Sequence, residues 1–109
     1  SSPLIVATVD VGLRYIWIYN PHPDFDSKKL IGKRDDEIDK NDGTKALVQL
    51  KRKALKTGEP VRKTIVFPLS NGEITYDVTA EAIRDTEGNI IGVTTASMDI
   101  GERKKKKSK

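Results

Sequence analysis

The sequence of 109 residues contains no cysteine and only one histidine, one tryptophan and one methionine. The absence of cysteine excludes a disulfide framework, a thiol nucleophile and a thiolate metal site, and it fits a reducing compartment. No apolar run approaches the roughly 18 residues that a membrane helix needs, and the short apolar N-terminus lacks the basic start of a signal peptide. We therefore expect a cytoplasmic domain that does not insert into a membrane.

Charge is concentrated at the C-terminus. The formal net charge is +4, but six of the twenty basic residues lie in residues 101–109, and the rest of the chain has 14 basic and 15 acidic residues. No aromatic residues alternate with the lysines of this tail to stack on bases, so a solvated segment is favoured over a nucleic-acid or anionic-lipid site. We expect one domain over residues 1–103, followed by a basic tail over 104–109 that is either a linker or a remnant of cloning.

Two strands are expected at the start of the chain. Residues 4–11 are β-branched and apolar, and Gly12 separates them from a second apolar run over residues 14–19. The second run has apolar side chains at both parities. Alternation then predicts that Ile16 and Ile18 face one side of a sheet and that the aromatic residues face the other.

One longer helix and three further strands follow. Short helical turns are expected after Asp26 or Ser27 and over 35–38, and apolar spacing predicts a helix over 44–57 that ends at Gly58. Residues 61–69, 74–84 and 89–100 predict an antiparallel meander, with Asn71-Gly72 as a tight turn. These elements predict an α+β fold with a five-stranded antiparallel sheet and helices packed on one face.

Five short strings, in this order, resemble the PAS family. They are residues 13–21, Leu-Ile-Gly-Lys at 30–33, Thr-Gly-Glu-Pro at 57–60, the segment 84–93, and Met-Asp-Ile-Gly-Glu-Arg-Lys at 98–104. The resemblance is closest to PAS domains that precede histidine kinase or diguanylate cyclase modules in prokaryotic sensors. It implies a sensor module of a signal-transduction protein without catalytic activity of its own, a sheet around a small cavity, and a helix that leaves after the last strand.

The resemblance also implies a route for the signal. Gly101 stands where the family usually has threonine, but Asp99 can cap a helix and Glu102 can reach back to it as in a capping box. We therefore expect Asp99, Glu102 and Arg103 to form the root of an exit helix that transmits a change in the sheet to an effector domain.

Cofactor chemistry finds little support. His22 lies between two prolines, which favours a turn residue over a haem ligand, and a flavin adduct is excluded because it requires cysteine. The single histidine and scattered carboxylates suit no catalytic arrangement. We expect no metal site either, since the acidic residues between the second strand and the helix lack the spacing of a calcium loop and suit solvated charges: Asp24, Asp26, Asp35, Asp36, Asp39 and Asp42.

An apolar cavity and an outer aromatic face remain as candidate sites. The cavity would suit a small apolar or amphipathic ligand, with the Tyr76 hydroxyl as a polar group, although a filled core without ligand is an equal alternative. Tyr15, Trp17 and Tyr19 are expected on the outer face as a homodimer interface; the alternative is a structural adaptor that binds a protein partner there. The expected cavity residues are Ile16, Ile18, Leu30, Ile38, Leu47, Leu50, Ile65, Phe67, Tyr76, Val78, Ala96 and Met98.

Overall fold

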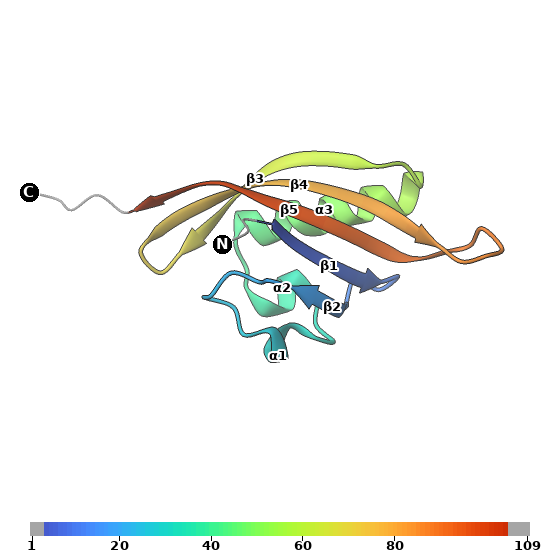
Figure 1. Ribbon diagram of the computed structural model, residues 1–109, viewed down its shortest axis with the longest axis horizontal. Coiled ribbons are helices and arrows are strands. Elements are labelled where there is room, and N and C mark those ends of the chain that lie inside the picture. Colours follow the sequence, from blue (N-terminus) through green and yellow to red (C-terminus); the bar gives the residue numbers. More distant parts are fainter. Residues whose placement is uncertain (1–3, 105–109) are drawn as a thin grey trace, which may run out of the picture.

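An antiparallel sheet with helices on one face forms the described part of the chain, residues 4–104 of a computed structural model (Figure 1). This architecture confirms the predicted α+β fold. Within these residues, no helix is long and apolar enough to cross a membrane. The elements are β1 (Leu4–Asp10), β2 (Tyr15–Tyr19), α1 (Ser27–Leu30), α2 (Asp35–Ile38), α3 (Asp42–Thr57), β3 (Val61–Leu69), β4 (Gly72–Arg84) and β5 (Ile90–Lys104).

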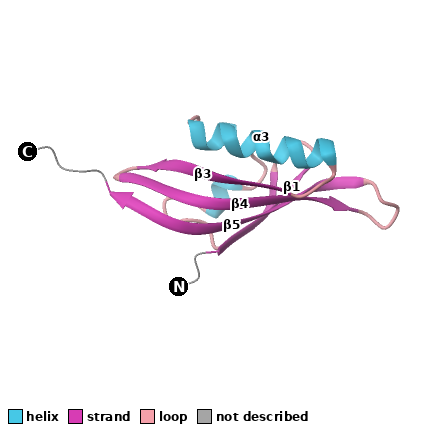
Figure 2. Ribbon diagram, turned by 90° about the horizontal axis from the view of Figure 1, so that it is seen from above, coloured by secondary structure: helices cyan, strands magenta, loops and turns pink. Residues whose placement is uncertain are grey.

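The sheet order is β2-β1-β5-β4-β3, so the last strand pairs with the first and occupies the centre. The helix α3 packs across one face of β3, β4 and β5. Figure 2 shows this helix along one side of the sheet. We call the side that faces α3 the inner face and the opposite side the outer face.

Local signals set the ends of α3. The Asn41 side chain accepts a hydrogen bond from Thr44 N at 2.9 Å, and the Thr44 hydroxyl accepts one from Asn41 N at 3.1 Å, so the two residues cap the first turn reciprocally. The helix ends at Gly58, whose φ of 70° lies in the left-handed region that glycine adopts without strain. These caps fix the helix over the inner face.

A bulge in β2 changes the predicted orientation of its side chains. Thr8 pairs with Trp17 and Val9 pairs with Tyr15, so Ile16 is an extra residue between two register positions. As a result Ile16 is 57% exposed, whereas Tyr15 is buried. The predictions that Ile16 lines the cavity and that Tyr15 belongs to an outer interface are therefore wrong.

The expected parity of β5 is also wrong. Alternation from the buried Val93 turns Thr95 and Ser97 inward, and both line the inner cavity. Ala96 and Met98 consequently face outward, and Met98 is about half exposed. The prediction placed Ala96 and Met98 in the core because they are apolar, but the polar residues between them occupy the inner positions.

The last strand extends past the point where an exit helix was expected. Asp99 pairs with Tyr76 and Arg103 pairs with Glu73, so residues 99–104 continue β5 along β4. The Asp99 carboxylate accepts a hydrogen bond from Gly101 N at 2.9 Å within the strand instead of capping a helix. The helix root predicted at Asp99, Glu102 and Arg103 is therefore wrong, and residues 105–109 of the basic tail lie outside the described residues.

Candidate functional site

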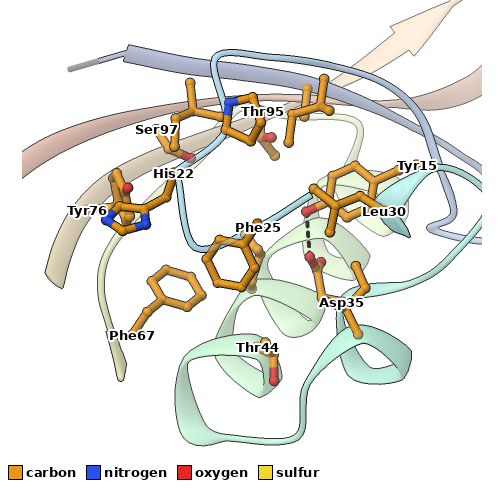
Figure 3. A pocket seen from close by; sticks show the side chains of 16 residues that line it. Tyr15, His22, Phe25, Leu30, Asp35, Thr44, Phe67, Tyr76, Thr95 and Ser97 are labelled. Carbon is orange, nitrogen blue, oxygen red and sulfur yellow. Dashed lines mark hydrogen bonds between the residues drawn. The ribbon is translucent and has the colours of Figure 1, made fainter. Parts of the chain in front are cut away.

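A cavity of about 100 Å³ lies between the inner face of the sheet and the segment that carries α1, α2 and the start of α3 (Figure 3). Its wall is mostly apolar, with polar side chains among the apolar ones. The lining residues are Ile5, Ala7, Tyr15, Ile18, Pro21, His22, Phe25, Leu30, Asp35, Ile38, Thr44, Leu47, Phe67, Tyr76, Thr95 and Ser97.

Half of the predicted cavity residues line this space. Three others are buried in the adjacent core but are not part of the wall, and the remaining three face away because of the bulge in β2 and the parity of β5. The lining members are Ile18, Leu30, Ile38, Leu47, Phe67 and Tyr76; the buried ones are Leu50, Ile65 and Val78; those facing away are Ile16, Ala96 and Met98.

One end of the cavity is formed by a buried polar cluster of Tyr15, Asp35 and Lys51. The Tyr15 hydroxyl donates a hydrogen bond to one oxygen of Asp35, and Lys51 Nζ donates to the other at 2.6 Å. Lys51 Nζ also donates to the Tyr15 hydroxyl at 3.0 Å and lies 4.2 Å from the centroid of the Tyr15 ring. The cluster joins β2, α2 and α3 through side chains.

Backbone contacts hold Tyr15 in place at this end. Its amide donates to Lys33 O at 3.0 Å, and its carbonyl accepts a hydrogen bond from Gly32 N at 2.8 Å. These bonds attach the segment after α1 to the free edge of β2. The phenol of Tyr15 therefore projects into the space between the sheet and α2 from an anchored backbone.

Burial and charge determine the protonation of the cluster. Burial raises the pKa of Tyr15 well above its usual value, and the adjacent Asp35 carboxylate raises it further. Burial lowers the pKa of Lys51, while the charge and hydrogen bond of Asp35 act in the opposite direction. The phenol thus remains protonated and can donate to Asp35 at neutral pH.

Sequence reasoning missed this cluster. Asp35 was assigned to solvated loop charges, but its residue is only 4% exposed. The available signal was Lys51, which lies four residues after Leu47 and three before Ala54 and therefore falls on the apolar face of the helix. A lysine at such a position needs a buried partner of opposite charge, and an acidic residue upstream is the natural candidate.

The opposite end of the cavity carries His22 and Tyr76 (Figure 3). His22 Nδ1 accepts a hydrogen bond from Asp24 N at 3.1 Å, as expected for a turn residue, and this bond leaves the ring proton on Nε2. The ring also packs edge to face against Phe25 and lines the cavity, with 15% of its side chain exposed. The prediction of a turn residue holds, but it omitted the contact with the cavity.

Two carboxylates of β5 lie near this end. A second bulge, at Ile100, lets Asp99 pair with Tyr76 and Glu102 pair with Ile74, so both acidic residues follow the inner face. Glu102 Oε2 lies 4.0 Å from His22 Nε2. Burial, together with the charges of Asp99 and Glu102, raises the pKa of Tyr76 to about 12. The structure thus brings Asp99 and Glu102 to the cavity end, whereas Arg103 is exposed beyond it.

We predict that Lys51→Met destabilises the fold by about 3–5 kcal/mol, because the buried Asp35 carboxylate loses its counter-ion. The free energy of unfolding in urea measures this loss. Lys53→Met is the matched control on the exposed face of α3, and a change within about 0.5 kcal/mol is expected there. Equal effects of the two substitutions would contradict the assigned role of Lys51.

Comparison with known proteins links this fold and cavity to a family. A family model described as "PAS fold" matches residues 1–105. Probable histidine kinase 1 of Oryza sativa subsp. indica is 31% identical over 111 residues, and Histidine kinase 5 of Arabidopsis thaliana is 28% identical over 110. Both alignments cover 100% of this chain but only 11% and 12% of the relatives, so the chain spans about a tenth of their length.

Solved structures share the fold at low sequence identity. Vibrio cholerae VqmA in a complex with ligand and DNA matches with a TM-score of 0.75 and 17% identity, over 90% of this chain and 46% of that one. Drosophila melanogaster Cycle PAS-B with bound ethylene glycol matches with a TM-score of 0.69 and 14% identity, over 88% of this chain and 99% of that one. A sensory box sensor histidine kinase from Vibrio cholerae matches with a TM-score of 0.68 and 14% identity, over 90% of this chain and 82% of that one.

Binding of DNA is described for VqmA and not for this chain. The expectation that this domain does not bind nucleic acid therefore stays a prediction. The histidine kinase relatives agree with the resemblance found in the sequence, and they extend it to two plant proteins. The family match over residues 1–105 and the shared architecture show that this chain belongs to the PAS family, whose domains are sensor modules rather than catalysts.

Proposed function

We propose that the domain senses a small, partly polar molecule in its cavity and passes the bound state through the C-terminal part of β5 to the rest of a longer signalling protein. The observation that carries this proposal is the cavity itself, which the sheet and all three helical segments line together. A molecule bound there would contact both layers of the fold, so its presence would change their packing. The histidine kinase relatives suggest an effector of that class.

The contact between His22 and Glu102 supports a route out of the cavity. His22 lines the cavity, and Glu102 lies on β5 only a few residues before the described strand ends. A ligand that displaces the His22 ring would change the interaction between His22 and Glu102, and with it the electrostatic field at Tyr76. Asp99 and Glu102 therefore keep a proposed role in transmission, as residues of a strand. Arg103 would act only through its pairing with β4.

A substitution that fills the cavity tests the sensor proposal. Thr95 lines the cavity, and Thr95→Leu would occupy part of it with two additional side-chain carbons and no hydroxyl. Thr79→Leu makes the same change on the outer face of β4. In native mass spectrometry of protein purified without refolding, we expect a co-purifying small molecule with the wild type and with Thr79→Leu, and its loss with Thr95→Leu. The mass of the polypeptide alone in all three proteins would contradict the proposal.

The outer face supports a second part of the proposal, self-association. We define the outer patch as Val6, Trp17, Tyr19, Ala96 and Met98, which cross-strand pairing brings together: Val6 pairs with both Tyr19 and Ala96. Trp17 is 50% exposed and Tyr19 is 54% exposed on the outer face, opposite α3. Exposed aromatic residues of this kind are enriched at interfaces. A second copy of the chain is the proposed occupant, and one VqmA structure is likewise described as a dimer.

We predict that Trp17→Ser weakens self-association about thirtyfold or more, because a tryptophan at the centre of an interface contributes about 2 kcal/mol or more. Sedimentation velocity over a concentration series measures the dissociation constant. Ile91→Ser is the control, since Ile91 is also 50% exposed but lies near the other end of β5. A monomeric wild type at all concentrations would favour the alternative of an adaptor that binds another protein on this face.

A further inference from the structure

The cluster of Tyr15, Asp35 and Lys51 presents oxygen atoms to the cavity. Tyr15 and Asp35 line the wall, whereas Lys51 lies behind them and is not part of it. Each oxygen of Asp35 accepts one hydrogen bond within the cluster, so each retains a lone pair for a further donor. The only proton of the Tyr15 hydroxyl is already donated to Asp35. A molecule at this end therefore meets acceptors without a free donor from these two residues.

The charge balance of the cluster limits what can bind there. Asp35 and Lys51 neutralise each other at 2.6 Å, and the side chain of Lys51 is fully buried. An ammonium group placed against Asp35 would add a second positive charge close to Lys51, and burying a charge without its own partner costs several kcal/mol. A ligand carboxylate would be repelled by the negative charge of Asp35 at this end of the cavity and by the negative charges of Asp99 and Glu102 at the other end. Both signs of ligand charge are disfavoured.

The volume of the cavity limits the size of the ligand, and its aromatic wall favours an apolar chain or ring. A cavity of about 100 Å³ is smaller than the roughly 150 Å³ cavity that binds benzene in an engineered protein. Phe25 and Phe67 lie between the two polar ends (Figure 3). Such a space fits a short apolar chain or small ring with a polar group at one end.

From this arrangement we propose that the cavity selects small uncharged molecules that donate a hydrogen bond to the Asp35 carboxylate, such as short-chain alcohols or primary amides. This inference rests on the proposed ligand-sensing function and names the chemical class of its ligand. Asp35 is the residue that determines specificity. Lys51 is a positioning residue, because it acts on the ligand only through Asp35.

Four probes of similar size test the ligand class: butan-1-ol, its isomer methoxypropane, butylammonium and butyrate. The ether lacks only the donor, and the two ions add charge of either sign. Titrations followed by amide chemical shifts give the dissociation constants. We expect saturable shifts at lining residues with butan-1-ol, about tenfold weaker binding of methoxypropane, which corresponds to one lost hydrogen bond of about 1.4 kcal/mol, and no saturable binding of either ion.

A variant with an apolar cluster tests the role of Asp35. The triple substitution Tyr15→Phe, Asp35→Leu and Lys51→Met replaces all three polar groups together, a type of change that often preserves or increases stability. In this variant butan-1-ol and methoxypropane should bind equally well. Lys53→Met serves as the control and should keep the preference for the alcohol. Should the triple variant not fold, the carboxyl ¹³C resonance of Asp35 in the wild type gives the same information, because it should move with butan-1-ol and not with methoxypropane.

The outcomes separate this inference from the proposed function. Binding of the alcohol and the ether with equal affinity to the wild type, or tighter binding of an ion, would overturn the ligand class and leave the ligand site intact. An Asp35 resonance that stays fixed while butan-1-ol saturates the lining amides would overturn the role of Asp35. If none of the four probes binds, the proposed ligand site itself fails, and this inference fails with it.

Discussion

The hydrogen-bonded cluster of Tyr15, Asp35 and Lys51 fixes the positions of β2, α2 and α3 relative to one another. Its Lys51 side chain is fully buried and pairs with the buried Asp35. Formation of this ion pair and the packing of α3 on the sheet therefore depend on each other. A buried charge pair gains little net stability compared with apolar residues, but loss of one partner is strongly unfavourable. The cluster therefore selects one arrangement of the helices, and that arrangement leaves a cavity beside it.

The bulges at Ile16 and Ile100 give the two faces of the sheet different side chains at the cavity. The bulge at Ile16 turns Tyr15 inward and leaves Trp17 and Tyr19 on the outer face, so the same strand contributes to the cavity and to the outer patch. The bulge at Ile100 brings Glu102 to the side of His22. In the proposed function, ligand binding and self-association thus involve opposite faces of one sheet, and β5 runs through its centre.

Much of the fold could be predicted from the sequence because its local signals agree. The apolar spacing of the helix expected over 44–57, the turn at Asn71-Gly72 and the glycine at 58 mark boundaries that the structure reproduces closely. Side-chain orientation in β2 could not be predicted, since a bulge inverts the alternation and carries no distinct sequence pattern. In β5 the prediction failed for another reason: the polar Thr95 and Ser97, not the apolar residues beside them, occupy the inner positions. The exit helix expected at Asp99 was wrong because pairing of residues 99–104 with β4 outweighs a weak capping signal.

The buried cluster depends on a Tyr15 phenol that stays protonated and donates to Asp35. Titration of this phenol tests that dependence most directly. A group whose pKa is raised on folding contributes stability that is present below its unfolded pKa, about 10 for tyrosine, and that is lost as the pH rises through its folded value. The ¹³Cζ resonance of Tyr15, followed from pH 8 to pH 11, should therefore stay at its protonated position in the folded protein. A titration midpoint near pH 10 without unfolding would show that the phenol is not held by a buried carboxylate, and it would contradict the account.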